Sequence, residues 1–340
     1  MHTIPELYSI LAKEFASSYT APCGYEWLTS VCGRRLRLQI AGLGDVGRTV
    51  AAGLRVLGGE VLESVGIFDL NEAQALRLEM ELNQIQAPCG NKPMPAVTVC
   101  GQEDLFDCDV FLYCATKSVP PVGGSVADVR MAQYDANRGI VGIYARQAAD
   151  RHFRGLFGVV SDPVDLLCMA ALRESVNGEQ PLHPEQVQGF GLGVMYARAA
   201  YYAAKAAADG DLPAAWFAGE GRVFGPHGAG LVAANSIKEE HYDQNASLQL
   251  TDRTVHANQE MRALGFKPYI APAFSSAAFS VLAAVSGEWC DSARYLNGLY
   301  FGARNRTLSS GTQWEDDILP DALWLRVEEA YRALEAFLCG

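Results

Sequence analysis

The sequence predicts an α/β protein built on a parallel β-sheet with helices on both faces. Between residues 36 and 176, short apolar segments rich in Val, Ile and Leu alternate with longer helical segments. This alternation is typical of parallel strands joined by crossover helices. The chain has 340 residues, of which 49% are hydrophobic and 19% are charged. It is therefore long enough to bury a large core and to form one large or two ordinary domains.

Each expected element follows from its local pattern. We expect strands at 36–42, 64–70, 96–101, 109–116 and 153–161, and helices at 45–59, 71–85, 129–150 and 165–175. Residues 1–35 form an expected N-terminal arm, a short amphipathic helix and a turn-rich stretch, that covers a neighbouring subunit or domain. The polar, proline-containing stretch after residue 176 marks the expected boundary between domains 36–176 and 177–340. The second domain combines an Ala-rich helix, Gly-rich loops and a long amphipathic C-terminal helix.

Charge and composition exclude several classes of partner. The formal net charge is −12, which opposes binding to nucleic acid or to an anionic membrane. No apolar run approaches the roughly 20 residues of a membrane span, and charged residues interrupt the N-terminal stretch, unlike a signal peptide. The nine cysteines show no metal-ligand spacing. We expect a cytoplasmic protein with free thiols and no metal site, whose partner is a small molecule.

A glycine-rich motif stands where the first strand meets the first helix. It reads Gly42-Leu43-Gly44-Asp45-Val46-Gly47 and has the GxGxxG spacing of dinucleotide-binding Rossmann folds. Glycines at these positions allow a tight turn and close backbone approach to a pyrophosphate, whose charge lies at the helix N-terminus. The motif predicts cofactor contacts by Gly42, Gly44, Asp45, Val46 and Gly47.

An acidic residue at the end of the second strand predicts which cofactor is bound. Asp69 lies 22 residues beyond Gly47 in the sequence, where a carboxylate can accept hydrogen bonds from both ribose hydroxyls of adenosine. Its charge would repel a 2′-phosphate, and no Arg follows it closely. The sequence therefore favours NAD over NADP.

Four further segments carry a family resemblance. In chain order they are RMAQYDAN at 130–137, VSDPVD at 160–165, VQGFGLGVMYAR at 187–198 and GPHGA at 225–229. With the glycine motif, they resemble segments of the L-lactate/malate dehydrogenases over roughly residues 36–340. The resemblance implies a Rossmann doubly wound parallel sheet followed by an α+β substrate domain, NAD as cofactor, and a homodimer or homotetramer.

The same resemblance implies roles for individual residues. Arg198 would form a bidentate pair with a substrate carboxylate. Arg130, on a closing loop, would polarise the substrate carbonyl, and His227 would transfer the proton.

Other positions are implied more indirectly. Ala115 and Asn137 would lie in the cofactor site, and Ser275 or Ser276 would replace a substrate-facing Thr of the family.

Two departures concern the proton-transfer residue. Met195 stands where the family has the Asp that orients His227, and loss of such a carboxylate can cost several powers of ten in rate. Asp162 stands where the family has Asn beside the reacting carbon. Asp162 could repel a keto acid, favour oxidised nicotinamide or a cationic substrate group, pair with His227 from the other side, or be a solvated acid at a strand end. We expect Asp162 in the catalytic site.

The lid and the motif after His227 also depart from the family. The loop 116–129 is about five residues longer and contains no Arg before Arg130, which disfavours a four-carbon dicarboxylate. Gly-Ala-Gly follows His227 without the family's Asp.

These observations support three hypotheses. The first is an NAD-dependent oxidoreductase that transfers a hydride to or from a small keto, hydroxy, imino or amino acid other than lactate or malate. The second is a non-catalytic NAD(H)-binding homologue, which explains Met195 simply. The third is an enzyme that uses bound NAD for transient oxidation before elimination or epimerisation.

Overall fold

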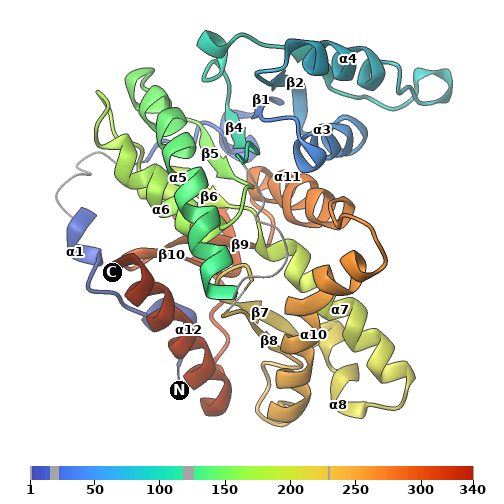
Figure 1. The fold of residues 1–340 in the computed structure, drawn as a ribbon, viewed down its shortest axis with the longest axis vertical. Coiled ribbons are helices and arrows are strands. Elements are labelled where there is room, and N and C mark those ends of the chain that lie inside the picture. Colours follow the sequence, from blue (N-terminus) through green and yellow to red (C-terminus); the bar gives the residue numbers. More distant parts are fainter. Residues whose placement is uncertain (1, 16–22, 118–125, 229, 340) are drawn as a thin grey trace.

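The structure is a computed structural model that describes residues 2–15, 23–117, 126–228 and 230–339, with the backbone alone at 14, 15 and 126–130. Nine strands in this part of the chain form one mixed sheet (Figure 1). In spatial order they are β11 (Gly311–Trp314), β10 (Leu299–Leu308), β9 (Cys290–Leu296), β6 (Val187–Gly189), β5 (Leu156–Val159), β4 (Val110–Tyr113), β1 (Leu36–Ala41), β2 (Leu62–Phe68) and β3 (Ala96–Val99).

The expected Rossmann sheet is confirmed. The first six strands are all parallel and take the order 3-2-1-4-5-6. Strand β1 lies between β2 and β4, so that Ala41 at its carboxyl end faces Phe68 on one side and Tyr113 on the other. The strand order reverses between β1 and β4, and ligands of doubly wound sheets bind at that switch point.

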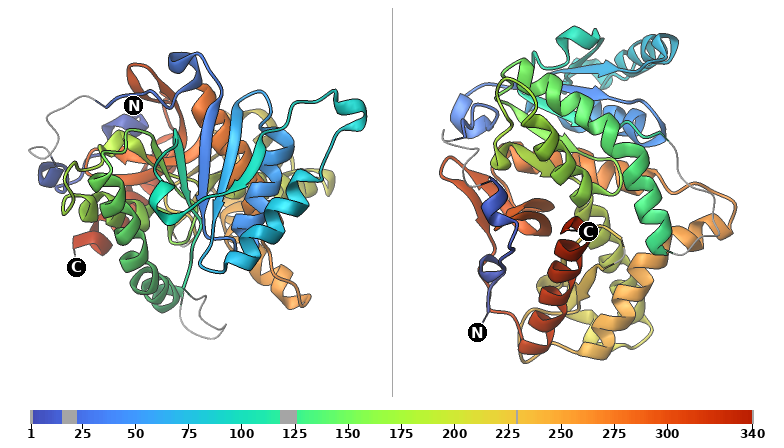
Figure 2. Two further views of the ribbon diagram at one scale, coloured as in Figure 1. Left: turned by 90° about the horizontal axis from the view of Figure 1, so that it is seen from above. Right: turned by 60° about the vertical axis from the view of Figure 1, so that its left-hand side comes forward.

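Helices cover both faces of the sheet because successive strand residues point to opposite sides. Val110 and Leu112 of β4 belong to one hydrophobic core, with α3 (Asp45–Leu57) and α4 (Glu72–Asn83). Phe111 and Tyr113 belong to the other core, with α5 (Val126–Asp150) and α6 (Val164–Ser175). Figure 2 shows the sheet between these two layers.

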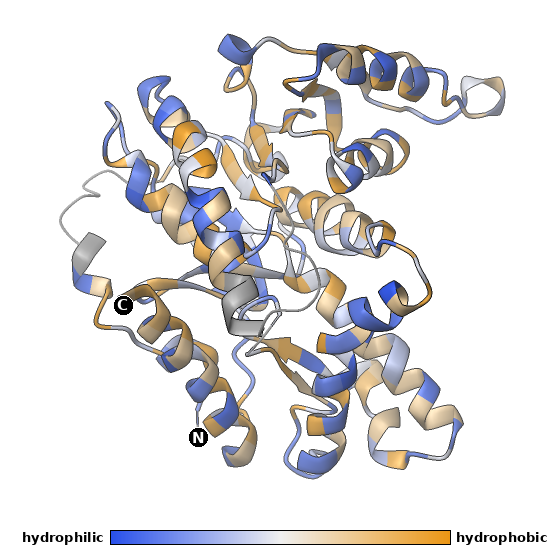
Figure 3. Cartoon of the chain, viewed as in Figure 1, coloured by the Kyte–Doolittle hydropathy of each residue, from blue (hydrophilic) through white to orange (hydrophobic). Residues whose placement is uncertain are grey.

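The second half of the chain adds a hairpin and a group of helices. These elements are α7 (Leu192–Ala208), α8 (Leu212–Ala215), α9 (Phe217–Glu220), β7 (Arg222–Phe224), β8 (Val232–Ala234), α10 (Gln244–Ala263), a π-helical segment (Pro272–Ala278), α11 (Phe279–Ser286) and α12 (Asp321–Cys339). Met195 and Tyr202 of α7 pack with Phe217 and Leu250 in a third hydrophobic cluster. Figure 3 shows α11 as mostly apolar, in keeping with its position against the Rossmann core.

The antiparallel strands β9, β10 and β11, whose positions were not predicted, extend the Rossmann sheet at β6. Gly189 and Ala293 are the one registered pair between β6 and β9 in the described residues. Next to this pair, the fully buried Arg294 side chain donates to Gln188 Oε1 at 3.1 Å and to Glu185 Oε2 at 3.0 Å. Arg294 therefore holds together a seam that has few backbone hydrogen bonds. Strands from before and after residue 177 belong to the same sheet. The division into two domains at this residue stays a prediction.

The N-terminal arm packs on its own chain. It contains short helices at Ile4–Glu6, Ala12–Phe15 (α1) and Thr29–Cys32 (α2). The Ile10 amide donates to Glu335 of α12 at 2.7 Å, and Asn297 Nδ2 donates to the Leu7 carbonyl at 2.6 Å. The arm thus lies along the C-terminal helix, near both chain ends in Figure 1. Contact with a second subunit stays a prediction.

Short 3-10 helices complete the described elements, at Pro88–Gly90, Gln102–Asp104 and Pro184–Gln186. A search of the described residues finds no helix long and apolar enough to cross a membrane.

Replacement of Arg294 by Met tests the seam between the parallel and antiparallel strands. We expect Arg294→Met to lower the free energy of unfolding by roughly 3–5 kcal/mol, because it leaves the partly buried Glu185 without its cation. Arg306→Met is the control, since Arg306 is partly exposed on β10 and bonds the neutral Gln313, so its loss should cost less than about 1 kcal/mol. Urea unfolding measures both variants, and equal losses would show that Arg294 does not hold the seam.

Candidate active site

The glycine motif forms a turn at the carboxyl end of β1 that leaves room for a ligand. Gly42 has φ +97°, which favours glycine, and a Cβ there would lie 2.5 Å from the backbone of Ala115. A Cβ on Gly47 would clash with the Gly42 carbonyl oxygen. By contrast, nothing lies within 4 Å of a Cβ placed on Gly44. The first and third glycines therefore serve packing, whereas the second faces open space where a pyrophosphate can approach.

Asp69 lies at the end of β2 beside this open space. Its carboxylate accepts the Leu43 amide at 2.7 Å and the Asn71 amide at 2.9 Å, so it holds the glycine turn against the second strand. Two hollows of about 530 and 540 Å³ adjoin it, one toward Gly44 and Ala115 and one toward the end of β3. The residues present fit an extended dinucleotide that crosses the end of β2.

Asp45 and Val46 begin helix α3. The Asp45 carboxylate pairs with Arg48 of the same helix at 2.5 Å and with Lys267 at 3.4 Å. Val46 is half-buried against the core beneath α3. The basic partners offset the negative charge that Asp45 would bring next to a pyrophosphate.

Asn137 is buried and joins the ends of two strands. Its Oδ1 accepts the Lys117 amide at 2.9 Å, after β4, and its Nδ2 donates to the Asp162 carbonyl at 3.3 Å, after β5. The Ser161 hydroxyl adds a second link by donating to the Ala115 carbonyl at 2.8 Å. These bonds fix Asp162 at the end of β5, with β4 between it and the glycine turn after β1. Direct contact of Asn137 with a cofactor stays a prediction.

Arg130 belongs to the first turns of α5, and its side chain lies outside the described residues. The expected lid falls largely on 118–125, which also lie outside the described part of the chain.

His227 lies in the loop between β7 and β8, held at three atoms. Its amide donates to the buried carboxylate of Asp165 in α6 at 3.0 Å. Nδ1 lies 2.8 Å from the Gly191 carbonyl, and Nε2 lies 3.4 Å from Oδ1 of Asp162. The His227 side chain is 14% exposed, whereas that of Asp162 is 50% exposed. The imidazole is therefore fixed from behind, with Nε2 directed at the side of the site that solvent reaches.

The contact with Gly191 determines the tautomer of His227. A carbonyl oxygen only accepts, so Nδ1 carries a proton and Nε2 is the nitrogen that exchanges one. Nε2 and Asp162 Oδ1 lie at ion-pair distance, so a protonated imidazole would be attracted to this carboxylate. Among the roles considered for Asp162, pairing with His227 agrees with this geometry. The pairing uses Nε2, the nitrogen that faces the site, and not Nδ1.

Met195 brings no charge to the position of the missing carboxylate. It is buried in the third hydrophobic cluster, and its sulfur lies 3.7 Å from Nη1 of Arg198. The Gly191 carbonyl thus fixes the tautomer of His227 without supplying a negative charge behind it.

Arg198 lies on the face of α7 that begins at Gly191. Residues seven apart share one face of a helix, about 10 Å apart along its axis. Its Nη2 donates to Asn258 Oδ1 of α10 at 2.5 Å. Burial lowers the pKa of the Arg198 guanidinium, and the negative charge of Asp162 opposes that shift. The carboxylate of Asp162 therefore acts electrostatically on both His227 and Arg198.

The two candidate serines have different positions. The buried Ser276 hydroxyl donates to the Gly191 carbonyl at 2.7 Å and accepts the Val194 amide at 2.9 Å. Ser276 therefore supports the start of α7. Ser275 is half-buried, and its contact with a substrate stays a prediction.

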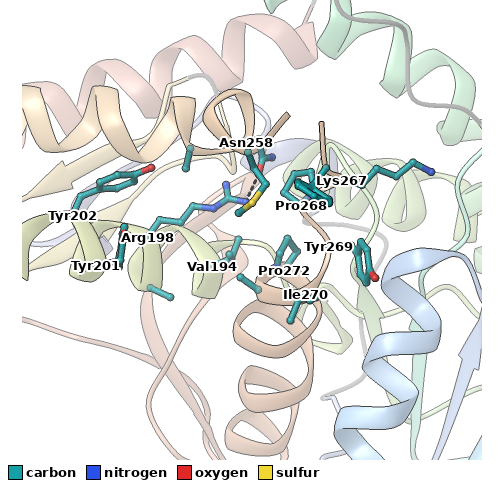
Figure 4. Close-up of a pocket in the computed structure, with 15 residues that line it drawn as sticks. Val194, Arg198, Tyr201, Tyr202, Asn258, Lys267, Pro268, Tyr269, Ile270 and Pro272 are labelled. Carbon is teal, nitrogen blue, oxygen red and sulfur yellow. Dashed lines mark hydrogen bonds between the residues drawn. The ribbon is translucent and has the colours of Figure 1, made fainter. Parts of the chain in front are cut away.

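A cavity of about 650 Å³ opens beside Arg198, between α7, α10 and residues 266–272. Figure 4 shows the Arg198 side chain directed at Asn258, with Tyr201 and Tyr202 at one end of the group and Tyr269 at the other. Among the described residues, no cluster of three His, Cys, Asp or Glu side chains could hold a metal ion.

Sequence reasoning missed Gly191, Asp165 and Asn258. The first acts through its carbonyl, which no side-chain motif reveals. Asp165 belongs to the segment VSDPVD, and the available signal was a carboxylate in the first turn of a helix, which can accept hydrogen bonds from backbone amides. Asn258 meets Arg198 only through the packing of α7 on α10.

Comparison with known proteins shows partial similarity in sequence and broad similarity in fold. No protein-family model matches the chain. Over 144 residues the sequence is 29% identical to L-lactate dehydrogenase of Bacillus caldotenax, a match that covers 42% of this chain and 42% of that enzyme. The sequence match therefore spans less than half of either protein.

Solved structures match over a greater length. Minor L-lactate dehydrogenase of Enterococcus mundtii superposes with a TM-score of 0.72 at 20% identity, over 89% of this chain and 97% of that one. Malate dehydrogenase of Picrophilus torridus gives a TM-score of 0.70 at 18% identity, over 89% and 96%. The chain thus has the fold of the L-lactate and malate dehydrogenases, and its resemblance to that family is confirmed.

Proposed function

We propose that this protein is an NAD-dependent oxidoreductase that transfers a hydride to or from a carboxylate-bearing substrate other than lactate or malate. The observation that carries the proposal is the position of the His227 and Asp162 pair, linked through Asn137 to the strand ends beside the glycine turn. A titratable pair next to a dinucleotide site is what proton-coupled hydride transfer requires.

In this proposal, the bound nicotinamide supplies or accepts the hydride. Arg198 pairs with the substrate carboxylate and orients the adjacent carbon. His227 Nε2 donates a proton to the oxygen or nitrogen on that carbon during reduction and accepts it during oxidation. The Gly191 carbonyl holds Nδ1–H throughout, and Asp162 stabilises the protonated imidazole from the solvent side.

Asp162 also bears on the chemical class of the substrate. The negative charge of Asp162 acts on Arg198 and weakens the attraction of this guanidinium for the carboxylate of a substrate. It simultaneously favours a protonated amine or imine at the neighbouring carbon. An amino or imino acid therefore suits the site better than an oxo acid does.

A second candidate function is supported by Met195. The missing carboxylate behind His227 agrees with a homologue that binds NAD(H) without catalysis, acting as a sensor. Binding of cofactor without turnover of any acid or amine would favour it.

Cofactor preference tests the role of Asp69. We expect calorimetry to give tighter binding of NAD(H) than of NADP(H), because the Asp69 carboxylate repels a 2′-phosphate. Asp69→Asn should lower the ratio of the NADP(H) to the NAD(H) dissociation constant about tenfold, which corresponds to roughly 1.4 kcal/mol. The exposed Asp107→Asn serves as control and should leave it unchanged. Equal or tighter NADP(H) binding by the parent protein would contradict the role given to Asp69.

Variants of the proton-transfer and carboxylate-binding residues test the reaction. With a panel of 2-oxo acids plus ammonia and of amino acids, His227→Ala should abolish the change in nicotinamide absorbance while NAD affinity stays within about twofold. Arg198→Lys should raise KM, because an ammonium cannot reproduce the planar fork. Pyruvate and oxaloacetate should turn over more slowly than about 1 per second, the low end of ordinary enzymes. Unchanged turnover in His227→Ala would refute its assigned role.

Asp162→Asn tests the choice between oxo and amino substrates. Removing the negative charge of Asp162, which acts on Arg198, should favour oxo-acid binding by about 1 kcal/mol, or roughly fivefold. The same change should weaken amine binding. Kd values for matched oxo and amino acids, measured with and without the substitution, decide the point. Parallel shifts of both would mean that Asp162 does not discriminate between them.

A further inference from the structure

The cavity beside Arg198 is much larger than a three-carbon acid requires. Its volume of about 650 Å³ falls within the usual range for small-molecule sites, roughly 300–1,000 Å³. A three-carbon acid has six non-hydrogen atoms and needs on the order of 150 Å³, since one water takes about 30 Å³ in the liquid. Most of the cavity therefore remains for another part of the ligand.

The wall of the cavity is mainly apolar and aromatic. The apolar and aromatic lining residues are Val194, Ala197, Tyr201, Tyr202, Ala257, Met261, Phe266, Pro268, Tyr269, Ile270, Ala271 and Pro272. Tyr201, Phe266 and Ile270 remain 63%, 68% and 62% exposed. A ligand group that covers these side chains would remove apolar surface from water, which is favourable in proportion to the area covered.

Arg198 gives the cavity an anchor for an acid, whereas Lys267, the other cation in its wall, pairs with Asp45 at 3.4 Å. In the described part of the chain its guanidinium has one oxygen partner, the neutral Asn258 Oδ1, besides the Met195 sulfur. No carboxylate lies within ion-pair distance of it among the described residues. A partly buried guanidinium whose partners within hydrogen-bond distance are neutral is suited to pair with an anionic group of a ligand.

We propose that the substrate carries a bulky apolar group, aromatic or branched aliphatic, and that this cavity binds that group while Arg198 pairs with the carboxylate. The inference rests on the proposed function for the reacting end of the molecule. It adds that an aliphatic or aromatic acid, not a small polar one, is selected. Concave walls around a buried cation favour a small acid over a second copy of the chain, which would need a complementary acidic projection.

A graded ligand series tests this proposal. The probes are 2-oxo acids with methyl, isobutyl and benzyl side chains, titrated by calorimetry with and without NAD⁺. Because neither NAD⁺ nor a 2-oxo acid can donate a hydride, no turnover disturbs the measurement. We expect the benzyl acid to bind roughly 10- to 100-fold more tightly than the methyl acid, the gain for burying a large apolar side chain. Equal affinities across the series would overturn the proposal.

A matched pair of variants locates the binding. Ala197→Phe, on the cavity wall, should weaken the benzyl acid at least tenfold relative to the methyl acid. Ala204→Phe, on an exposed position of α7 outside the cavity, should change neither. Tyr201→Ala, at the exposed rim, provides a second variant that removes wall area and should reduce the preference for the benzyl acid. If Ala197→Phe instead changes the oligomeric mass in ultracentrifugation and leaves the size preference intact, a second copy covers the cavity and the proposal fails.

The two proposals fail in different ways. Suppose that affinity rises with the size of the ligand side chain, that Ala197→Phe removes this trend, and that no hydride is transferred to any acid or imine. This result would refute the proposed oxidoreductase and uphold the cavity assignment. Rapid turnover with no preference for large side chains would do the reverse.

Discussion

The carbonyl oxygen of Gly191 is the constraint on which the arrangement of the site depends. It accepts His227 Nδ1 and the Ser276 hydroxyl, and thereby joins the β7–β8 loop and the π-helical segment to the start of α7. A Cβ at this position would lie 3.1 Å from the Cβ and Cγ of His227 and 2.8 Å from Val164. Any larger residue would push the imidazole away from the strand ends. Glycine is therefore needed for space here, although its φ of −126° is open to other residues.

That neutral acceptor changes how a protonated His227 is stabilised. A carboxylate behind the ring would both fix the tautomer and offset the positive charge, whereas the Gly191 carbonyl performs only the first task. The compensating charge comes from Asp162, which lies at the nitrogen that exchanges the proton. A substrate must therefore displace or share this contact, and a substrate that brings its own positive charge does so at least electrostatic cost.

The Rossmann half of the fold was predictable because its signals are local. The strand order follows from alternating strands and helices, and the spacing of Gly42, Gly44 and Asp69 fixes the turn at the switch point. Strands β9 to β11 were not predicted, because their polar residues, such as Arg294 and Asn305, are buried and hydrogen-bonded and mask the usual apolar pattern. The residues around His227 were identified by motif, but the partner of Nδ1 was not, since a backbone carbonyl carries no sequence signal.

The two ends of the candidate site are held by different interactions. At the cofactor end, Asn137 and Ser161 tie the loops after β4 and β5 together, so a change in any one of them would move the proton-transfer pair relative to the glycine turn. Beside Arg198, the cavity wall comes from α7, α10 and the segment 266–272. Its exposed side chains do not take part in these hydrogen bonds. Under the proposed function, substitutions there would change the size of the group that the cavity accepts and leave the bonds around His227 in place. Substrate choice could then diverge from that of the structural relatives without a change in the geometry around His227.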